Sequence, residues 1–239
     1  MSEILKVEGL SYRYADGPEA IRGVSFSIKA GERAAFIGPN GAGKSTMILA
    51  IGGFLRAEGE IRIFGEKLTP KSAPRLRGRL GIVFQEPEDQ LFMPTLFDDV
   101  AFGPLNLGLP EAEVRERVKR ALAQVGLAGL EQRSPHHLSG GEKKSAAIAT
   151  ILSMQPELII LDEPTANLDA RSKKRLVGVL RALDCTLLLS SHDLDSVVQL
   201  CQRAILLDSG TLVADLSIAE LRERRHILEE HGLEPPREW

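Results

Sequence analysis

Gly38-Pro39-Asn40-Gly41-Ala42-Gly43-Lys44-Ser45 is the stretch that decides the fold, because it matches the phosphate-loop pattern G-x-x-x-x-G-K-[ST]. The apolar run Arg33–Ile37 precedes it and predicts a strand, and residues 44–54 after it predict a helix. In a strand, glycine-rich loop and helix, backbone N–H groups and the positive end of the helix dipole surround a phosphate. The stretch therefore predicts an α/β domain that binds a nucleoside triphosphate.

The side chains at the end of this loop predict how the phosphates are held. Lys44 would reach the β- and γ-phosphates, and Ser45 would offer its hydroxyl to Mg²⁺. We therefore expect ATP and Mg²⁺ as ligands. The expected nucleotide contacts here are Gly38, Pro39, Asn40, Gly41, Ala42, Gly43, Lys44, Ser45 and Thr46.

A second acidic motif follows the apolar strand predicted at residues 158–161. Asp162 and Glu163 come directly after it, and the carboxyl ends of buried strands are where α/β sheets bind ligands. Asp162 would hold Mg²⁺ through water. Glu163 would polarise the water that attacks the γ-phosphate, which makes it the expected catalytic base.

The rest of the chain alternates buried strands with helices, which predicts a mostly parallel sheet. We expect an N-terminal antiparallel β part, a helical subdomain at about residues 86–155, and one ATP-binding domain over residues 1–215. A short helical tail covers residues 216–239, with its last residues frayed. The expected strands are 4–14, 24–28, 33–37, 59–64, 80–84, 158–161, 186–189, 204–207 and 211–214, and the expected helices are 44–54, 96–102, one from 110, 141–154, 170–183 and 217–230.

Composition limits the function classes. Apolar residues make up 43% of the 239 residues and charged residues 26%, as in ordinary globular proteins. The net charge of −3 gives no footprint for nucleic acid. The N-terminus is charged and lacks the apolar stretch of a signal peptide, and no run is long enough to cross a membrane. Cys185 and Cys201 are expected to be reduced thiols. Any membrane role would require a protein partner.

Leu138-Ser139-Gly140-Gly141-Glu142 lies between the phosphate loop and the acidic motif, and with this order the sequence resembles the ABC transporter ATPases from about residue 4 to about 215. The resemblance implies roles for six further positions. Gln85 would touch Mg²⁺ and sense membrane subunits, and residues 167–169 would communicate across a dimer. His192 would act near the γ-phosphate, and Tyr14 would stack on adenine.

The Ser139-Gly140-Gly141 segment also favours dimerisation on physical grounds. It begins a predicted helix and so offers N–H groups as a second anion site. One chain already holds its own nucleotide through the phosphate loop. In the family this second site closes on the nucleotide of a facing subunit, so we expect a homodimer or a heterodimer with a second ATPase.

Residues 84–110 and 135–144 resemble the energy-coupling-factor branch of the family, especially its cobalt and nickel ATPases. This resemblance implies a transmembrane coupling subunit docked on the insertion, a substrate-binding membrane component, and a peripheral position on the cytoplasmic face of the membrane. A vitamin importer, another ABC transporter and a soluble ABC ATPase remain alternatives. The adjacent His136 and His137 point apart and do not predict a metal site.

One position departs from the family pattern. Ser145 stands where the family usually has an arginine. Whatever that arginine anchors in the helix after Gly141 must be held in another way.

Overall fold

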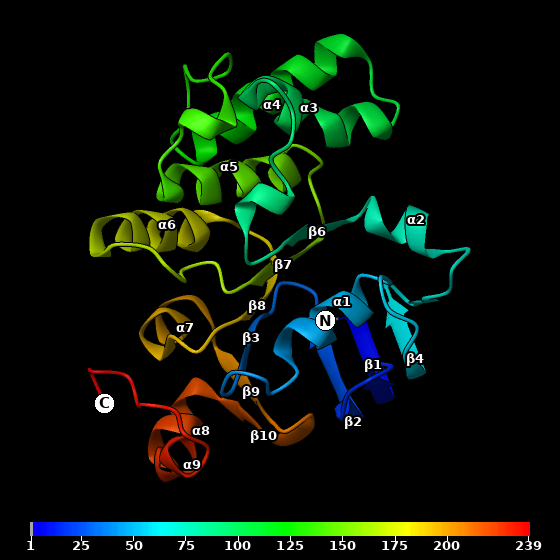
Figure 1. Ribbon diagram of the computed structural model, residues 1–239, viewed down its shortest axis with the longest axis vertical. Coiled ribbons are helices and arrows are strands. Elements are labelled where there is room, and N and C mark those ends of the chain that lie inside the picture. Colours follow the sequence, from blue (N-terminus) through cyan, green and yellow to red (C-terminus); the bar gives the residue numbers. More distant parts are fainter. Residues whose placement is uncertain (1) are drawn as a thin grey trace. The chain divides into compact units, whose positions relative to one another are not determined.

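The computed structural model describes residues 2–239 and contains two compact units (Figure 1). The first is formed by the chain up to Arg77 together with Asp184–Trp239, and the second by Gly78–Leu183. The predicted helical subdomain lies within the second unit, and the C-terminal tail belongs to the first.

An antiparallel sheet opens the first unit. Its strands are β1 (Glu3–Arg13), β2 (Glu19–Lys29), β4 (Glu58–Ile63) and β5 (Glu66–Lys67), in the order β2-β1-β4-β5. Leu5 of β1 lies opposite Ile28 on one side and Ile63 on the other, and all three are buried. The alternation that predicted a strand at residues 24–28 is part of the longer strand β2, which has one buried face.

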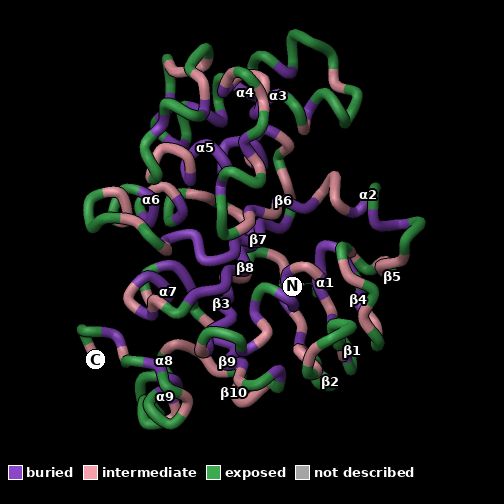
Figure 2. Tube along the Cα trace, viewed as in Figure 1, coloured by how far each residue is buried: buried purple, intermediate pink, exposed green. Residues whose placement is uncertain are grey.

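The parallel part of the first unit contains the strand that leads into the phosphate loop. β3 (Arg33–Ile37) lies between β8 (Thr186–Ser190) and β9 (Arg203–Asp208) and is parallel to both, and β10 (Thr211–Ser217) is antiparallel to β9. β8 is buried along its whole length, as Figure 2 shows. Such continuous apolar strands require cover on both faces. The helices of this unit are α1 (Lys44–Ile51), α2 (Ala73–Arg77), α7 (Leu194–Leu200), α8 (Ile218–Glu223) and α9 (His226–Glu230).

The second unit combines two strands with a group of helices. β6 (Leu80–Val83) pairs in parallel with β7 (Leu158–Asp162). The helices of this unit are α3 (Leu96–Asn106), α4 (Glu111–Gln124), α5 (Gly140–Leu152) and α6 (Ala170–Ala182), with short 3-10 turns at Pro87–Asp89 and Pro135–His137. Helices α3, α4 and α5 pack on one another through apolar side chains such as Val100, Val118 and Ile148.

The α/β class with an N-terminal antiparallel sheet and a helical insertion is confirmed, and the differences are local. The helix after the phosphate loop ends at Ile51, because Gly52 and Gly53 follow it. The predicted helix 217–230 is two short helices. The last residues are held rather than frayed, since Arg237 N–H donates to Asp195 Oδ1 at 2.9 Å. Among residues 2–239 no helix is long and apolar enough to cross a bilayer.

Candidate active site

The phosphate loop of the first unit joins β3 to α1 and leaves the start of α1 open. Gly43 occupies the N-cap position with φ 102°, and no side chain caps the helix. The first N–H groups of a helix have no partner inside the helix, so this end is available to an anion. This is the geometry that the motif predicted.

Two glycines of the loop are fixed by close backbone approaches. A Cβ on Gly38 would lie 2.0 Å from the carbonyl oxygen of Leu207, and one on Gly43 would lie 2.5 Å from that of Ala20. Both residues also have positive φ. The loop therefore packs directly on β9 and β2, and side chains at these positions would displace it.

Lys44 is buried, with 6% of its surface exposed. Its Nζ donates to the Gly38 carbonyl at 2.7 Å and to the Pro39 carbonyl at 3.1 Å. The ammonium group therefore lies across the inside of the loop. A cation held at this place beside the open end of α1 fits the phosphates of a nucleotide.

Tyr14 lies above the first turn of α1. Its hydroxyl is 3.3 Å from Thr46 Oγ1, and Tyr12 packs edge-on against its ring with centroids 4.9 Å apart. Tyr14 remains 42% exposed, so its ring can take a flat partner. His192 is exposed just beyond β8, which ends beside β3 in the same unit. The first unit thus holds Tyr14, the phosphate loop and His192.

Asp162 ends the strand β7 of the second unit, and Glu163 follows it directly. They are 5% and 6% exposed, which is unusual for carboxylates. Glu163 has φ 46°, a left-handed conformation that few residues other than glycine adopt. Backbone strain of this kind is concentrated at functional sites. The buried, strained Glu163 agrees with its expected role as the base.

Lys144 is a residue of this site that the sequence analysis did not single out. It lies on α5 and is 9% exposed. Its Nζ donates to the Gln85 carbonyl at 3.2 Å and to the Glu163 carbonyl at 3.1 Å. One ammonium group therefore joins the two residues expected to contact metal and water. Burial lowers the pKa of Lys144, against the opposing effect of Glu86, Glu163 and other carboxylates.

The sequence did contain a signal for Lys144. Two adjacent lysines precede the apolar run Ala146–Ile151 on one helix, and adjacent helical positions face different directions. Lys143 lies nearer the surface and pairs with Glu88 at 2.7 Å. The side chain of Lys144 points towards the protein interior.

Ser139 begins α5 with a capping box. Its hydroxyl accepts from Glu142 N–H, and the Glu142 carboxylate accepts from Ser139 N–H at 2.8 Å. The bonds that the Glu142 carboxylate accepts from the Ser139 N–H group and hydroxyl lower the pKa of Glu142. The sequence analysis expected the Ser139 N–H group to be unbonded, but it is hydrogen-bonded to Glu142. Those of Gly140 and Gly141 make no hydrogen bond within residues 2–239, so the second anion site is reduced to these two groups.

The serine that replaces the family arginine lies beside a cavity of about 390 Å³. Ser145 is buried in its wall, and two arginines of α6 line the same space. Asp169 caps α6 by accepting from Arg171 and Ser172 N–H groups, which lowers the pKa of Asp169. Positive charge beside α5 is thus supplied by Arg171 and Arg175 of α6. The lining is Ser139, Gly141, Glu142, Ser145, Asp169, Arg171, Ser172 and Arg175.

The structure places the predicted residues in two groups. Tyr14, residues 38–46 and His192 belong to the first unit. The second unit holds Gln85, Ser139, Gly140, Gly141, Asp162 and Glu163. Lys144 of the same unit links Gln85 to Glu163 through hydrogen bonds to their carbonyl groups.

The chain is similar to known proteins over nearly its whole length. A family model described as "ABC transporter" matches residues 21–166. The energy-coupling factor transporter ATP-binding protein EcfA of Methanothermobacter thermautotrophicus is 46% identical, over 98% of this chain and 77% of the relative.

Two solved structures have the same fold. One is cbiO1 from Clostridium perfringens, described as part of the ABC transporter complex cbiONQ. Its TM-score is 0.85 at 37% identity, covering 96% of this chain and 94% of the other. The second is the ATP-binding cassette MJ0796 as a dimer bound to ADP and Pi, with a TM-score of 0.80 at 27% identity over 90% of this chain and 98% of the other. The chain belongs to the ABC transporter family of ATP-binding proteins, and its enzymatic activity is ATP hydrolysis coupled to transport.

Proposed function

We propose that this chain is the ATP-hydrolysing subunit of an energy-coupling-factor importer, which takes up a metal ion, cobalt or nickel, through separate membrane subunits. Its similarity to EcfA and to cbiO1 supports this branch of the family. The observation that carries the proposal is an exposed apolar surface on the segment whose sequence resembles that branch.

This insertion surface consists of Phe92, Phe102, Leu105 and Leu107. Their exposed fractions are 61%, 44%, 55% and 44%, and they supply four of the six large apolar side chains exposed among residues 2–239. Phe92 and Phe102 pack edge-on with ring centroids 5.2 Å apart. Exposed apolar clusters mark interaction sites. A membrane-spanning partner would cover this surface.

Asp99 holds the exposed Phe92 in place. It is 3% exposed, and its Oδ1 accepts from the N–H groups of Phe92 and Met93, each at 3.0 Å. The surface is therefore a fixed part of the fold rather than a loose loop.

The site residues fit the chemistry of ATP hydrolysis. Lys44 and the open start of α1 provide donors for phosphate oxygens, and Tyr14 offers a ring face to adenine. Ser45, Gln85 and Asp162 each carry an oxygen of the kind that Mg²⁺ prefers, and in this proposal they would hold the ion. Mg²⁺ would neutralise charge that develops on the phosphates. Glu163 would accept a proton from the attacking water, and His192 would bond the γ-phosphate.

The Gly140 and Gly141 N–H groups support a dimeric arrangement. They would form an anion site, and they belong to a unit other than the one that contains the phosphate loop. A second copy, or a second ATPase, would present these groups to the nucleotide of its partner. We place the chain on the cytoplasmic face of the membrane, bound through its partners.

The proposal is tested by purifying the tagged chain from gently solubilised native membranes. We expect a polytopic coupling subunit and a separate binding component to accompany it. Metal analysis and ligand release from that component distinguish a metal ion from a vitamin. Recovery of the ATPase alone from the soluble fraction would contradict the proposal.

A matched pair of variants locates the docking surface. Phe102→Ser should lose the membrane partner and retain ATP binding, because the side chain is exposed on the insertion surface. Lys119→Ser, on the exposed face of α4, should retain both. Equal recovery of the partner with both variants would remove the insertion surface from docking.

A further inference from the structure

The turn between β9 and β10, residues 208–210, packs against the phosphate loop. The N–H group of Gly210 donates to the Ala42 carbonyl at 3.2 Å, and the Gly210 carbonyl accepts from Arg22 N–H at 2.7 Å. Ser209 and Gly210 have φ 48° and 79°, both in the left-handed region. Because the turn is bonded to the backbone in the middle of the loop, the position of the turn sets the position of the loop.

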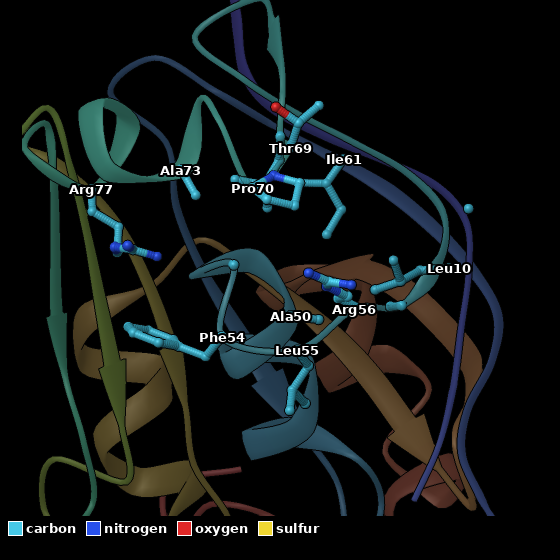
Figure 3. A pocket seen from close by; sticks show the side chains of 14 residues that line it. Leu10, Ala50, Phe54, Leu55, Arg56, Ile61, Thr69, Pro70, Ala73 and Arg77 are labelled. Atoms are coloured by element: carbon cyan, nitrogen blue, oxygen red, sulfur yellow. The ribbon is translucent and has the colours of Figure 1, made fainter.

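The opposite end of α1 is held by other contacts. It borders a pocket of about 540 Å³ into which Arg56 and Arg77 point, as Figure 3 shows. Arg77 donates to the Gly52 carbonyl at 3.4 Å and lies 5.4 Å from the centroid of the Phe54 ring. At the phosphate-loop end no side chain caps α1. The contacts that hold this end are therefore those of the loop, among them the turn after β9.

The turn is itself held by the C-terminal segment of the chain. This C-terminal strap, residues 226–239, contains α9 and packs on the first unit through the buried Leu228 and Leu233. His231 Nδ1 lies 2.7 Å from Asp208 Oδ2, and both side chains are half-buried. An ionised carboxylate can only accept a hydrogen bond, so the ring nitrogen is the donor.

Asp208 joins the strap to the turn. Its Oδ1 accepts from the Ser209 hydroxyl at 3.0 Å, and its carbonyl accepts from the Thr211 hydroxyl at 2.8 Å. The hydrogen bond from His231 is the main cause that lowers the pKa of Asp208, so this carboxylate is ionised at neutral pH. Hydrogen bonds to an ionised acceptor are stronger than those between neutral groups. Loss of the His231 donor would therefore release the residue at which the turn begins.

A second contact joins the strap to the segment that follows β8. Arg237 N–H donates to Asp195 Oδ1 at 2.9 Å, and Arg237 Nε lies 3.6 Å from Asp195 Oδ2. Asp195 is in the first turn of α7, shortly after His192. The strap is thus fixed at two places, and both are next to segments of the first unit that are expected to face the phosphates.

We infer that His231 is a positioning residue for ATP binding: by holding Asp208, it keeps the turn after β9 against the phosphate loop in the conformation that binds ATP. His231 acts through Asp208 and Gly210 rather than by contact with the nucleotide. Coupling of this kind is reciprocal, so an occupied phosphate loop also stabilises the docked strap. The inference rests on the proposed role of the phosphate loop and does not depend on a membrane partner.

The first experiment separates the hydrogen bond from the packing of the imidazole ring, in the isolated full-length chain. His231→Phe keeps a ring and removes the donor, whereas His231→Asn removes the ring and keeps a donor near the position of Nδ1. His231→Phe should raise the KM for ATP and the Kd of a fluorescent ATP analogue about fivefold, at the low end for coupling between two sites. Its kcat should stay within about twofold, because the contact acts on ATP binding in the ground state and the transition state alike.

Two variants should resemble the wild-type chain. His231→Asn and the control His226→Ala, which is exposed at the start of α9, should keep KM and Kd within about twofold. Thermal unfolding shows that each variant is folded. Wild-type KM and Kd in His231→Phe would overturn the inference. An equal loss in His231→Phe and His231→Asn would also overturn it, since the shape of the ring and not its donor would then be responsible.

The second experiment needs no variant. Hydrogen exchange of the wild-type chain should be slower with saturating ADP than without it, in the peptides that contain residues 208–210 and 226–239, because the coupling is reciprocal. The measurement is made at a concentration at which light scattering shows a monomer, so that contacts with a second copy are not the cause. Unchanged exchange of the strap with ADP bound would overturn the inference.

Lys44→Ala distinguishes failure of this inference from failure of the site assignment. If Lys44→Ala binds the ATP analogue as the wild-type chain does, the assignment of the phosphate loop is wrong and this inference falls with it. If Lys44→Ala loses binding while His231→Phe keeps the wild-type Kd, the phosphate loop stands and the positioning role of His231 is wrong.

Discussion

Replacement of Lys144 by methionine tests whether one buried ammonium group positions the catalytic residues. Methionine keeps a long unbranched apolar side chain and removes the two N–H···O bonds to the Gln85 and Glu163 carbonyls. Hydrogen bonds from a charged donor contribute roughly 1.5–3 kcal/mol each, so the gross loss is about 3–6 kcal/mol. Relief of the buried charge offsets several kcal/mol of this. We expect a net destabilisation of about 1–2 kcal/mol.

That destabilisation corresponds to a fall in Tm of about 2–8 °C for a chain of this size. The effect on catalysis should be larger. Without its bond to Lys144, Glu163 loses a contact that fixes its backbone, and a displacement of about 1 Å can lower a rate about 100-fold. We expect kcat for ATP hydrolysis to fall between about 10- and 100-fold. ATP affinity should change little, because the phosphate loop is untouched.

The assay combines phosphate release, titration with a fluorescent ATP analogue and calorimetry, with Lys143→Met as the control. Lys143 is on the same helix and pairs with Glu88 near the surface, so its loss should leave kcat within about twofold. The reasoning is refuted if Lys144→Met retains the wild-type kcat, or if both variants lose activity equally.

The pH dependence of stability gives an independent check on Lys144. Burial places the pKa of Lys144 in the folded protein below its unfolded value. Between these two values the unfolded state binds more protons, so stability rises with pH. The wild-type protein should therefore gain stability relative to Lys144→Met as pH increases from 7 towards 10.

Changes at three further positions test the catalytic base, the phosphate loop and the support of the insertion surface. Glu163→Gln should lower kcat on the order of 10²–10⁴-fold and retain ATP binding, because it removes the base alone; phosphate release at the wild-type rate would contradict this. Gly38→Ala places a Cβ 2.0 Å from the Leu207 carbonyl, so it should destabilise the protein by more than about 3 kcal/mol and abolish ATP binding. Gly178→Ala, where a Cβ meets nothing within 4 Å, is its control in denaturant unfolding. Asp99→Ala should lose about 2–4 kcal/mol, since the Phe92 and Met93 N–H groups lose their acceptor, whereas Asp99→Asn should keep it. Burial raises the pKa of Asp99 in the folded protein above its unfolded value, so the wild-type protein loses stability as pH rises through the raised pKa. Asp99→Asn has no such proton to lose, so its stability relative to the wild-type protein should increase between pH 4 and 8. Denaturant unfolding of both proteins at these two pH values measures the difference.

The sequence predicted much of the fold, because its long elements have strong patterns. The amphipathic face of α4 and the buried strands β3, β7 and β8 follow directly from periodicity. Short elements were missed for the same reason. α2 and α7 have only five and seven residues, too few for a helical period to be distinguished. The predicted ends of α1 and of the helix at residues 217–230 were wrong, because local turns interrupt both segments.

The expected nucleotide contacts of the phosphate loop could be predicted from the sequence alone, since a phosphate loop is a local device whose residues are contiguous. Gly38 to Ser45 specify it without reference to any distant part of the chain. The resemblance to ABC ATPases added residues that no local pattern specifies, such as Gln85 and His192. Their expected roles follow from the order of the family's motifs along the chain.

Only the tertiary structure decided which residues surround these motifs. Lys144 became a candidate for positioning because α5 directs it between two carbonyls 59 and 19 residues away. The pocket of Arg56 and Arg77 exists because β1, β4 and α2 close around the end of α1. Glu163 acquired its left-handed backbone from the turn that ends β7. Motifs are local and can be read along the chain, whereas burial, uncompensated charge and strain arise when distant segments pack together.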